Sequence, residues 1–213
     1  MDIILFGMQG SGKGTQGKIL AEKYDLKIFE MGGALREMIA SGTELGNKIK
    51  ATVEAGQLVS DEIIMQVVEA FLSHQPQAQG LLFDGIPRTL VQANALLELL
   101  KTHGREAFGI NIKIAEDEAV KRLTSRRVCN KCKTIHPGFY EGDKCKECGG
   151  ELYTRTDDSN LESIQNRLDS FKKETMPLIE SFNDRDRLIE VDGEQDIDDV
   201  TTEMHEKAGY LFR

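Results

Sequence analysis

The sequence predicts an α/β fold in which a parallel β-sheet is flanked by helices on both faces. Short apolar runs alternate along the chain with stretches of helical periodicity, as in a sheet whose strands are joined by crossover helices. A glycine-rich loop separates the first apolar run from the first helical stretch. The chain has 213 residues, of which 39% are hydrophobic and 30% charged, so we expect a single folded unit with a sizeable core.

The expected strands are the apolar runs at residues 2–6, 26–29, 80–84, 109–114 and 187–191. A helix should follow the glycine loop over residues 12–24, and another should span residues 61–74 behind Ser60 as N-cap. Ser159 and Glu162 have the spacing of a capping box. They predict a helix that runs to Thr175 and stops before Pro177.

Two segments interrupt the alternation. Residues 30–59 contain two short helical patterns without a strand between them, and the segment from residue 122 is rich in cysteine and glycine. We therefore expect a core formed by residues 1–29, 60–121 and 160–213, with insertions at 30–59 and 122–159.

Charge and hydropathy limit the partners of the chain. Its net charge of -9 disfavours binding to nucleic acid or to a membrane surface. No segment approaches the roughly 20 apolar residues of a membrane span, and the first residues do not resemble a secretory signal. We expect a cytoplasmic protein, in which thiols stay reduced.

The loop "GMQGSGKGT" at residues 7–15 has the Gly-x4-Gly-Lys pattern of a phosphate-binding loop. Its backbone N–H groups can converge on phosphate oxygens, with the positive end of the following helix behind them. A structural glycine turn is the alternative, but the order of strand, loop and helix favours a P-loop NTPase-type sheet that binds ATP. Gly14 follows Lys13, so the hydroxyl that normally meets magnesium comes one position later, which argues against direct ligation of the metal. The expected ATP-binding residues here are Gly10, Ser11, Gly12, Lys13, Gly14 and Thr15.

All four cysteines lie between two arginines in one polar segment. Cys129 and Cys132 form one Cys-x2-Cys knuckle, and Cys145 and Cys148 form a second one after 12 intervening residues. Four thiolates at this spacing are typical of a structural Zn²⁺ site. Two disulfides are the alternative, disfavoured in a reducing compartment, and iron could replace zinc. His136 could be a ligand in principle, but with four thiols present we expect it to be an ordinary residue of this segment.

The phosphate loop in the form "GxxGSGKGTQ", together with "DGIPRTLVQA" at residues 84–93, resembles the adenylate kinases and related nucleoside monophosphate kinases. The resemblance covers nearly the whole chain and includes "SGTELG", "AGQLVSDE", "RLTSRRVC", "TRTDD" and "VDG". It implies reversible Mg²⁺-dependent transfer of the γ-phosphoryl group of ATP to AMP, giving two ADP. It also implies a parallel core, an AMP-binding helical insertion at residues 30–59 and a mobile lid that would carry the zinc.

The resemblance assigns roles by matching position. Arg122 and Gln195 are similar to residues that meet the ATP base, and Asp84 to the carboxylate that orients magnesium through water. Asp157 and Asp158 match an acidic pair that holds the lid arginines, although Asp157 could equally be a turn residue. The implied catalytic set is Lys13, Asp84, Arg88, Arg126, Arg155, Asp158 and Arg167.

On the acceptor side, Arg36 and Arg88 resemble the clamp on the AMP phosphate, and Gln92 resembles the residue that reads the adenine. The implied AMP-binding set is Met31, Arg36, Gln57, Leu58, Val59, Gly85, Arg88, Gln92, Arg155 and Arg167. Of the other arginines, we expect Arg105, Arg185 and Arg187 to lie on the surface, and Arg127 to be either functional or solvated.

The chain departs from the family before its "LR" dipeptide. The family pattern is Ser-Thr-Gly-Asp, whereas this chain has Glu30, Met31, Gly32 and Gly33. Met31 removes a hydroxyl near the acceptor base, and Gly33 removes a carboxylate near the magnesium waters. Met31 leaves open a kinase for UMP, CMP or GMP, and Gly33 leaves open a non-catalytic nucleotide sensor on the same fold. The paired cysteine knuckles leave a third alternative, a zinc-ribbon nucleic-acid binder, although the net charge of -9 argues against it. We favour a monomeric enzyme whose partners are the nucleotides ATP, AMP and ADP.

Overall fold

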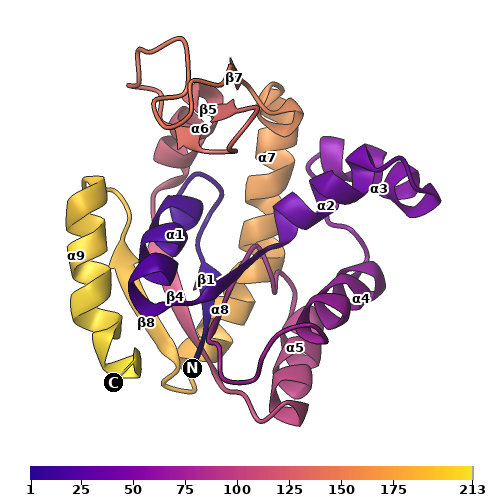
Figure 1. The fold of residues 1–213 in the computed structure, drawn as a ribbon, viewed down its shortest axis with the longest axis vertical. Coiled ribbons are helices and arrows are strands. Elements are labelled where there is room, and N and C mark those ends of the chain that lie inside the picture. Colours follow the sequence, from indigo (N-terminus) through magenta and orange to yellow (C-terminus); the bar gives the residue numbers. More distant parts are fainter. Residues whose placement is uncertain (213) are drawn as a thin grey trace.

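The computed structural model describes residues 1–212, which fold around a five-stranded parallel sheet with strand order β2-β3-β1-β4-β8 (Figure 1). Every strand expected from the sequence is present, with small shifts at its ends. The five strands are β1 (Asp2–Phe6), β2 (Lys27–Glu30), β3 (Leu81–Asp84), β4 (Ala107–Lys113) and β8 (Leu188–Asp192). The predicted α/β fold is confirmed.

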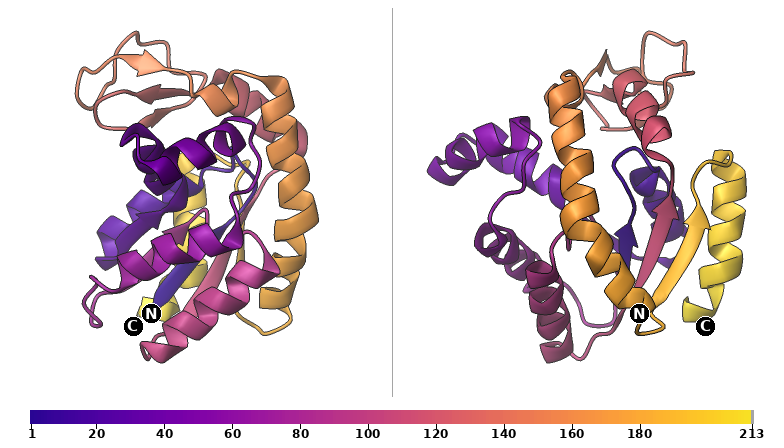
Figure 2. Two further views of the ribbon diagram at one scale, coloured as in Figure 1. Left: turned by 90° about the vertical axis from the view of Figure 1, so that its right-hand side faces the viewer. Right: turned by 180° about the vertical axis from the view of Figure 1, so that it is seen from behind.

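Helices cover both faces of this sheet (Figure 2). Helices α1 and α9 pack on one face, where Leu20 and Met204 share a core with Ile3. Helices α4, α5 and α8 pack on the other face around Ile4 and Phe83. The α-helices are α1 (Lys13–Tyr24), α2 (Met31–Ala40), α3 (Glu44–Glu54), α4 (Asp61–Leu72), α5 (Leu90–Thr102), α6 (Glu116–Ser125), α7 (Leu161–Ser170), α8 (Met176–Asn183) and α9 (Ile197–Ala208).

Two segments project from the core beyond the carboxyl ends of the strands. Helices α2 and α3 pack against each other beyond the carboxyl end of β2 (Figure 1). The cysteine segment, which we define as residues 126–155, lies above the phosphate loop between α6 and α7 (Figure 1). It contains a small antiparallel sheet of β5 (Arg127–Cys129), β6 (Ile135–His136) and β7 (Leu152–Tyr153).

The prediction of a helix from Ser159 to Thr175 is wrong at both ends. Asn160 is the N-cap of α7, and its side chain accepts a hydrogen bond from the backbone N–H of Glu162. Ser159 instead donates its hydroxyl to the carbonyl of Thr156. The helical structure does not stop before Pro177, because a π-helical turn, η2 (Phe171–Thr175), leads directly into α8. Proline is tolerated there because the first N–H groups of a helix need no intrahelical partner.

The sequence suggested that Arg105 lies on the surface, but its side chain is buried. Its guanidinium donates to both carboxylate oxygens of Asp2, at 2.7 and 2.9 Å. The two side chains are only 7% and 2% exposed. Asp2 also accepts the backbone N–H of Leu81, so this buried pair ties the start of β1 to β3. Each charge is compensated, as a buried ion pair requires.

Within residues 1–212, no helix combines the length and the apolar character that are needed to cross a lipid bilayer.

Candidate active site and metal centre

The phosphate loop lies between β1 and α1, as its sequence predicts. Gly12 is the N-cap of α1, and Lys13, Gly14 and Thr15 form the first turn of the helix. Gly7 has a φ of +141°, and a Cβ there would lie 2.5 Å from the carbonyl oxygen of Ile112. Only glycine lets the loop approach β4 this closely. The loop therefore presents backbone N–H groups and a helix N-terminus at the carboxyl edge of the sheet.

Lys13 is the half-buried cation of this loop. Its Nζ donates to the carbonyls of Gly7 and Met8 at 2.6 and 2.9 Å. Burial lowers its pKa to about 8, and the nearby positive charges of Arg88, Arg126 and Arg167 act in the same direction, whereas Asp84 opposes them. An anion at this place would be drawn to several cations at once.

Asp84 and Arg88 stand at the carboxyl end of β3. Burial raises the pKa of Asp84, although the charge of Lys13 partly offsets this. The Nε of Arg88 donates to the carbonyl of Gly85 at 3.0 Å, which fixes the start of its side chain. Thr175 in the π-helical turn donates to the carbonyl of Arg88 at 2.9 Å, so the unexpected turn helps to position this loop.

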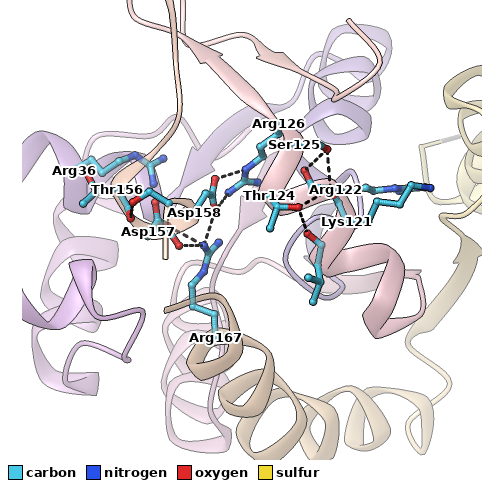
Figure 3. A network of polar contacts seen from close by, with 12 residues as sticks. Arg36, Lys121, Arg122, Thr124, Ser125, Arg126, Thr156, Asp157, Asp158 and Arg167 are labelled. Atoms are coloured by element: carbon cyan, nitrogen blue, oxygen red, sulfur yellow. Dashed lines mark hydrogen bonds and ion pairs between the residues drawn. The ribbon is translucent and has the colours of Figure 1, made fainter. Parts of the chain in front are cut away.

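Asp158 joins the cysteine segment to α7 (Figure 3). Its carboxylate accepts Nε and Nη2 of Arg126 at 2.5 and 2.9 Å and Nη1 of Arg167 at 2.8 Å. The side chain of Asp158 is fully buried. Burial alone would raise its pKa, but the two arginines outweigh burial and hold the pKa below its ordinary value. Asp157 adds an ion pair to Arg167 at 3.1 Å, so it is more than a turn residue.

Arg155 and Arg36 lie within electrostatic reach of each other. Burial, together with the charges of Arg126 and Arg36, lowers the pKa of Arg155 to about 10. Its Nε has no hydrogen-bond partner within residues 1–212. Arg36 extends from α2 toward Asp157 (Figure 3). The predicted arginines of the clamp and the lid therefore face a common centre.

Arg122 and Gln195 both lie near the carboxyl end of β8. The Nη1 of Arg122 donates to the carbonyl of Gly193 at 2.9 Å, and its Nε to Glu118 at 2.7 Å. Gln195 is exposed and donates to Glu203 at 2.6 Å. Gln195 thus belongs to the loop that follows β8, and Arg122 is bonded to the same loop.

Four residues of the implied AMP-binding set differ in their burial. Met31 and Val59 are buried in the hydrophobic core, while Leu58 is half-buried and Gln57 exposed. Gln92 is only 2% exposed, and both ends of its amide are bonded. Its Nε2 donates to Asp61 at 2.8 Å, and its Oε1 accepts the N–H of Arg88 at 2.7 Å. An amide can make two bonds at each end, so one donor and one acceptor position have no partner within residues 1–212.

The four cysteines form one cluster, in which every Sγ lies within 4.8 Å of the others. The Sγ atoms of Cys129 and Cys148 are 3.4 Å apart, and those of Cys132 and Cys145 are 3.5 Å apart. These separations exceed a disulfide bond and approach the roughly 3.8 Å expected between sulfurs on a tetrahedral Zn²⁺. The cysteines are free of disulfides. The cluster can therefore hold a metal ion with no open position.

The two knuckles have matching backbones. The N–H of Lys133 donates to the carbonyl of Cys129 at 3.2 Å, and the N–H of Gly149 to that of Cys145 at 2.9 Å. Both donors have a positive φ, +60° and +68°. Each knuckle is therefore a tight turn that brings its two sulfurs to the same side.

His136 is not part of the sulfur cluster, as expected from the sequence. It is fully buried in β6 and stacks on Tyr140. Arg127 donates to the carbonyl of Tyr140, so it is bonded within the segment and is not a freely solvated cation.

The chain was compared with known proteins. The adenylate kinase family model matches residues 5–187. Adenylate kinase of Archaeoglobus fulgidus is 41% identical over 209 residues, which cover 96% of each chain. Adenylate kinase of Methanocella arvoryzae is 39% identical over 209 residues with the same coverage. Adenylate kinase of Bacillus cereus is 38% identical over 216 residues, covering 99% of this chain and all of that protein.

The chain belongs to the adenylate kinase family. The expected family is therefore confirmed, together with the fold and the clustering of the cysteines. The roles of single residues remain predictions. Sequence reasoning missed some residues that shape the adenylate kinase site, among them Asp61, which binds Gln92, and Thr175, which binds the loop of Arg88. Their partners lie 31 and 87 positions away, beyond the reach of any local motif.

Ile135 was missed as well. A Cβ on Gly14 would lie 3.8 Å from Cδ1 of Ile135 and 3.8 Å from Oδ2 of Asp84. The tip of β6 is therefore close above the first turn of α1, so the cysteine segment covers the phosphate loop in this structure.

Proposed function

We propose that this protein is an adenylate kinase that transfers the γ-phosphoryl group of ATP to AMP and back, giving two ADP. The observation that supports this most is the convergence of six cations from five parts of the chain: the phosphate loop, α2, the loop after β3, the cysteine segment and α7. Lys13 lies within electrostatic reach of Arg88, Arg126 and Arg167, and Arg155 lies within reach of Arg126 and Arg36. Phosphoryl transfer depends on positioning and on neutralising charge, so such a ring of cations suits it.

Each of these side chains would have its own role in binding or transfer. The phosphate loop would bind ATP, with Arg122 and Gln195 beside its base. Arg36 and Arg88 would bind the acceptor phosphate, and Gln92 would use its free donor and acceptor positions for the base. Lys13, Arg126, Arg155 and Arg167 would stabilise the transferring group. Mg²⁺ bound with ATP would neutralise phosphate charge, and Asp84 would orient its waters.

The insertions would have separate tasks. Residues 30–59 would form the acceptor side, and residues 122–159 would form a lid that excludes water from the transfer. The four cysteines would hold a structural Zn²⁺, because four sulfur ligands leave no place for a reacting water. In this proposal zinc keeps the lid rigid, and the arginines bind the phosphates.

A coupled assay of ADP formation from ATP with AMP, UMP, CMP or GMP tests the proposal. We expect kcat/KM for AMP to exceed the other values by at least about tenfold, since a site that hydrogen-bonds one base rejects analogues that leave its polar groups unpaired. A different preferred acceptor would make the protein another nucleoside monophosphate kinase. If nucleotides bind but no ADP forms, the protein is a sensor and the proposal fails.

A further inference from the structure

Glu30 ends β2 at the carboxyl edge of the sheet, among the residues of the acceptor side. Its Oε1 accepts Nη2 of Arg36 at 2.9 Å. The side chains of Glu30 and Arg36 are 45% and 35% exposed, so the pair is partly exposed and is not part of the core.

Two glycines leave the space that this ion pair occupies. A Cβ on Gly33 would lie 2.7 Å from Oε2 of Glu30 and 3.4 Å from its Cδ. A Cβ on Gly32 would lie 3.1 Å from Nη1 of Arg36 and 3.2 Å from Oε1 of Glu30. The carboxylate of Glu30 thus lies where a side chain on residue 33 would begin. A carboxylate from position 30 is therefore present directly beside position 33, which has no side chain of its own.

Other charged groups face this carboxylate. Glu30 is the register partner of Asp84 in the parallel pair β2–β3, and its charge contributes to the raised pKa of Asp84 after the larger effects of burial and Lys13. The charges of Arg36 and Glu30 both act on Arg155. Glu30 therefore lies at the centre of the acceptor side, bonded to one of its cations.

We propose that Glu30 is the positioning residue of the acceptor site, which holds Arg36 in the orientation that binds the phosphate of the nucleoside monophosphate. The proposal rests on the proposed function. The arginine side chain is long and loses much rotamer freedom when it binds a ligand. One bond from Nη2 to Glu30 fixes the guanidinium in advance and leaves its other N–H groups for phosphate oxygens.

Calorimetric binding of AMP to the whole protein, without ATP and without Mg²⁺, tests this directly. We expect Glu30→Gln to raise the Kd for AMP about three- to tenfold, the range of one ordinary hydrogen bond. The Kd for ATP should stay within about twofold, because Glu30 bonds to no residue of the phosphate loop. An unchanged or lower Kd for AMP in Glu30→Gln would overturn the proposal, because it would show that the carboxylate only repels the phosphate.

A double-mutant cycle distinguishes positioning from a general structural effect. In the Arg36→Ala background, Glu30→Gln should change the Kd for AMP by less than about twofold, because the group that it positions is gone. An equal loss in both backgrounds would show that Glu30 acts without Arg36, and the proposal would fail.

Moving the carboxylate tests the link between positions 30 and 33. Gly33→Asp alone should bind AMP more weakly than Glu30→Gln, because the new side chain collides with Glu30 and repels it. The double variant Glu30→Ser with Gly33→Asp should return the Kd to within about threefold of the original protein. No recovery in a folded double variant would count against the proposal. If that variant does not fold, the Arg36 cycle decides alone.

Failure of this inference can be told apart from failure of the proposed function. If the unaltered protein forms no ADP, the proposed function fails. If it forms ADP and Glu30→Gln leaves AMP binding unchanged, only the role of Glu30 fails.

Discussion

The sheet and the cysteine segment lie on either side of the phosphate loop, but they are held together by different forces. The sheet is stabilised by fully buried aliphatic side chains such as Ile3, Leu82 and Ile110. The cysteine segment buries few apolar groups, mainly Val128 and the sulfurs of Cys129 and Cys145. Hydrophobic burial alone is not expected to hold a segment this small, and its four clustered sulfurs are placed to bind a metal that would supply the difference.

The two regions meet at Asp158. This carboxylate binds Arg126 at the start of the cysteine segment and Arg167 on α7, and the same arginines are proposed to bind the transferring phosphate. A buried carboxylate with two cations keeps both guanidiniums in place before any ligand is present. The following predictions test this division into a metal-held segment, a joint and a hydrophobic core.

The largest effect is expected from breaking the sulfur cluster. Cys129→Ser, or removal of the metal with a chelator, should unfold residues 126–155 at a lower temperature than the sheet. A structural zinc contributes about 10–16 kcal/mol in small peptides, more than any single side chain. Hydrogen exchange measured by mass spectrometry should show faster exchange in the segment and unchanged protection of β1 and β4. Lys131→Ala, an exposed change in the same knuckle, is the control, and an unchanged melting curve after metal removal would contradict the metal-held segment.

Asp158→Asn should destabilise the protein by about 3–5 kcal/mol, because two buried arginines would lose their counter-charge. Chemical denaturation measures this loss. Asp157→Asn is the matched control and should cost less, because its carboxylate is 19% exposed and makes one ion pair. Equal losses in the two variants would mean that Asp158 is not the joint.

The same carboxylate predicts a pH dependence. Because its pKa in the folded protein lies below its unfolded value, Asp158 adds stability above about pH 4, and this contribution disappears as the pH falls through the folded pKa. The free energy of unfolding should therefore fall below about pH 4 in the original protein and fall less steeply in Asp158→Asn. Parallel curves for the two proteins would assign the acid sensitivity to other groups.

A smaller effect is expected in the core. Ile110→Val removes one methylene from a fully buried position on β4 and should cost about 1 kcal/mol. The loss should appear in global unfolding and leave hydrogen exchange in residues 126–155 unchanged. Faster exchange in that segment would show that the sheet and the segment are one cooperative unit.

The smallest effect concerns Lys13. With a pKa of about 8, it is half protonated at pH 8, and the phosphates of ATP would raise that pKa. In the original protein, ATP binding should therefore take up as much as about half a proton more at pH 8 than at pH 6.5. Lys13→Arg should not show this additional uptake, because arginine stays charged at both pH values. Calorimetry in buffers of different ionisation enthalpy measures the difference. Equal uptake in the two proteins would place the pKa of Lys13 well above 8.

The sequence by itself determined the sheet, the phosphate loop and the two cysteine knuckles. Each of these depends on spacing within a few residues: the apolar runs of the strands, the glycines before Lys13, and the Cys-x2-Cys turns. The family resemblance implied that Asp157 and Asp158 hold the lid arginines, but only the structure shows that Asp158 binds Arg126 together with Arg167 on α7.

Only the tertiary structure decided the contacts between distant residues. Arg105 is buried because Asp2, 103 positions away, lies beside it, and Thr175 reaches Arg88 because a π-helical turn replaces the expected helix end. Glu30 has a partner because two glycines leave space for its carboxylate. A local pattern depends on backbone geometry within one turn or strand, so it can be read from neighbouring residues. The partner of a buried charge depends on which distant residues the fold brings close to it. Such a partner is needed because burying an unpaired charge costs too much free energy.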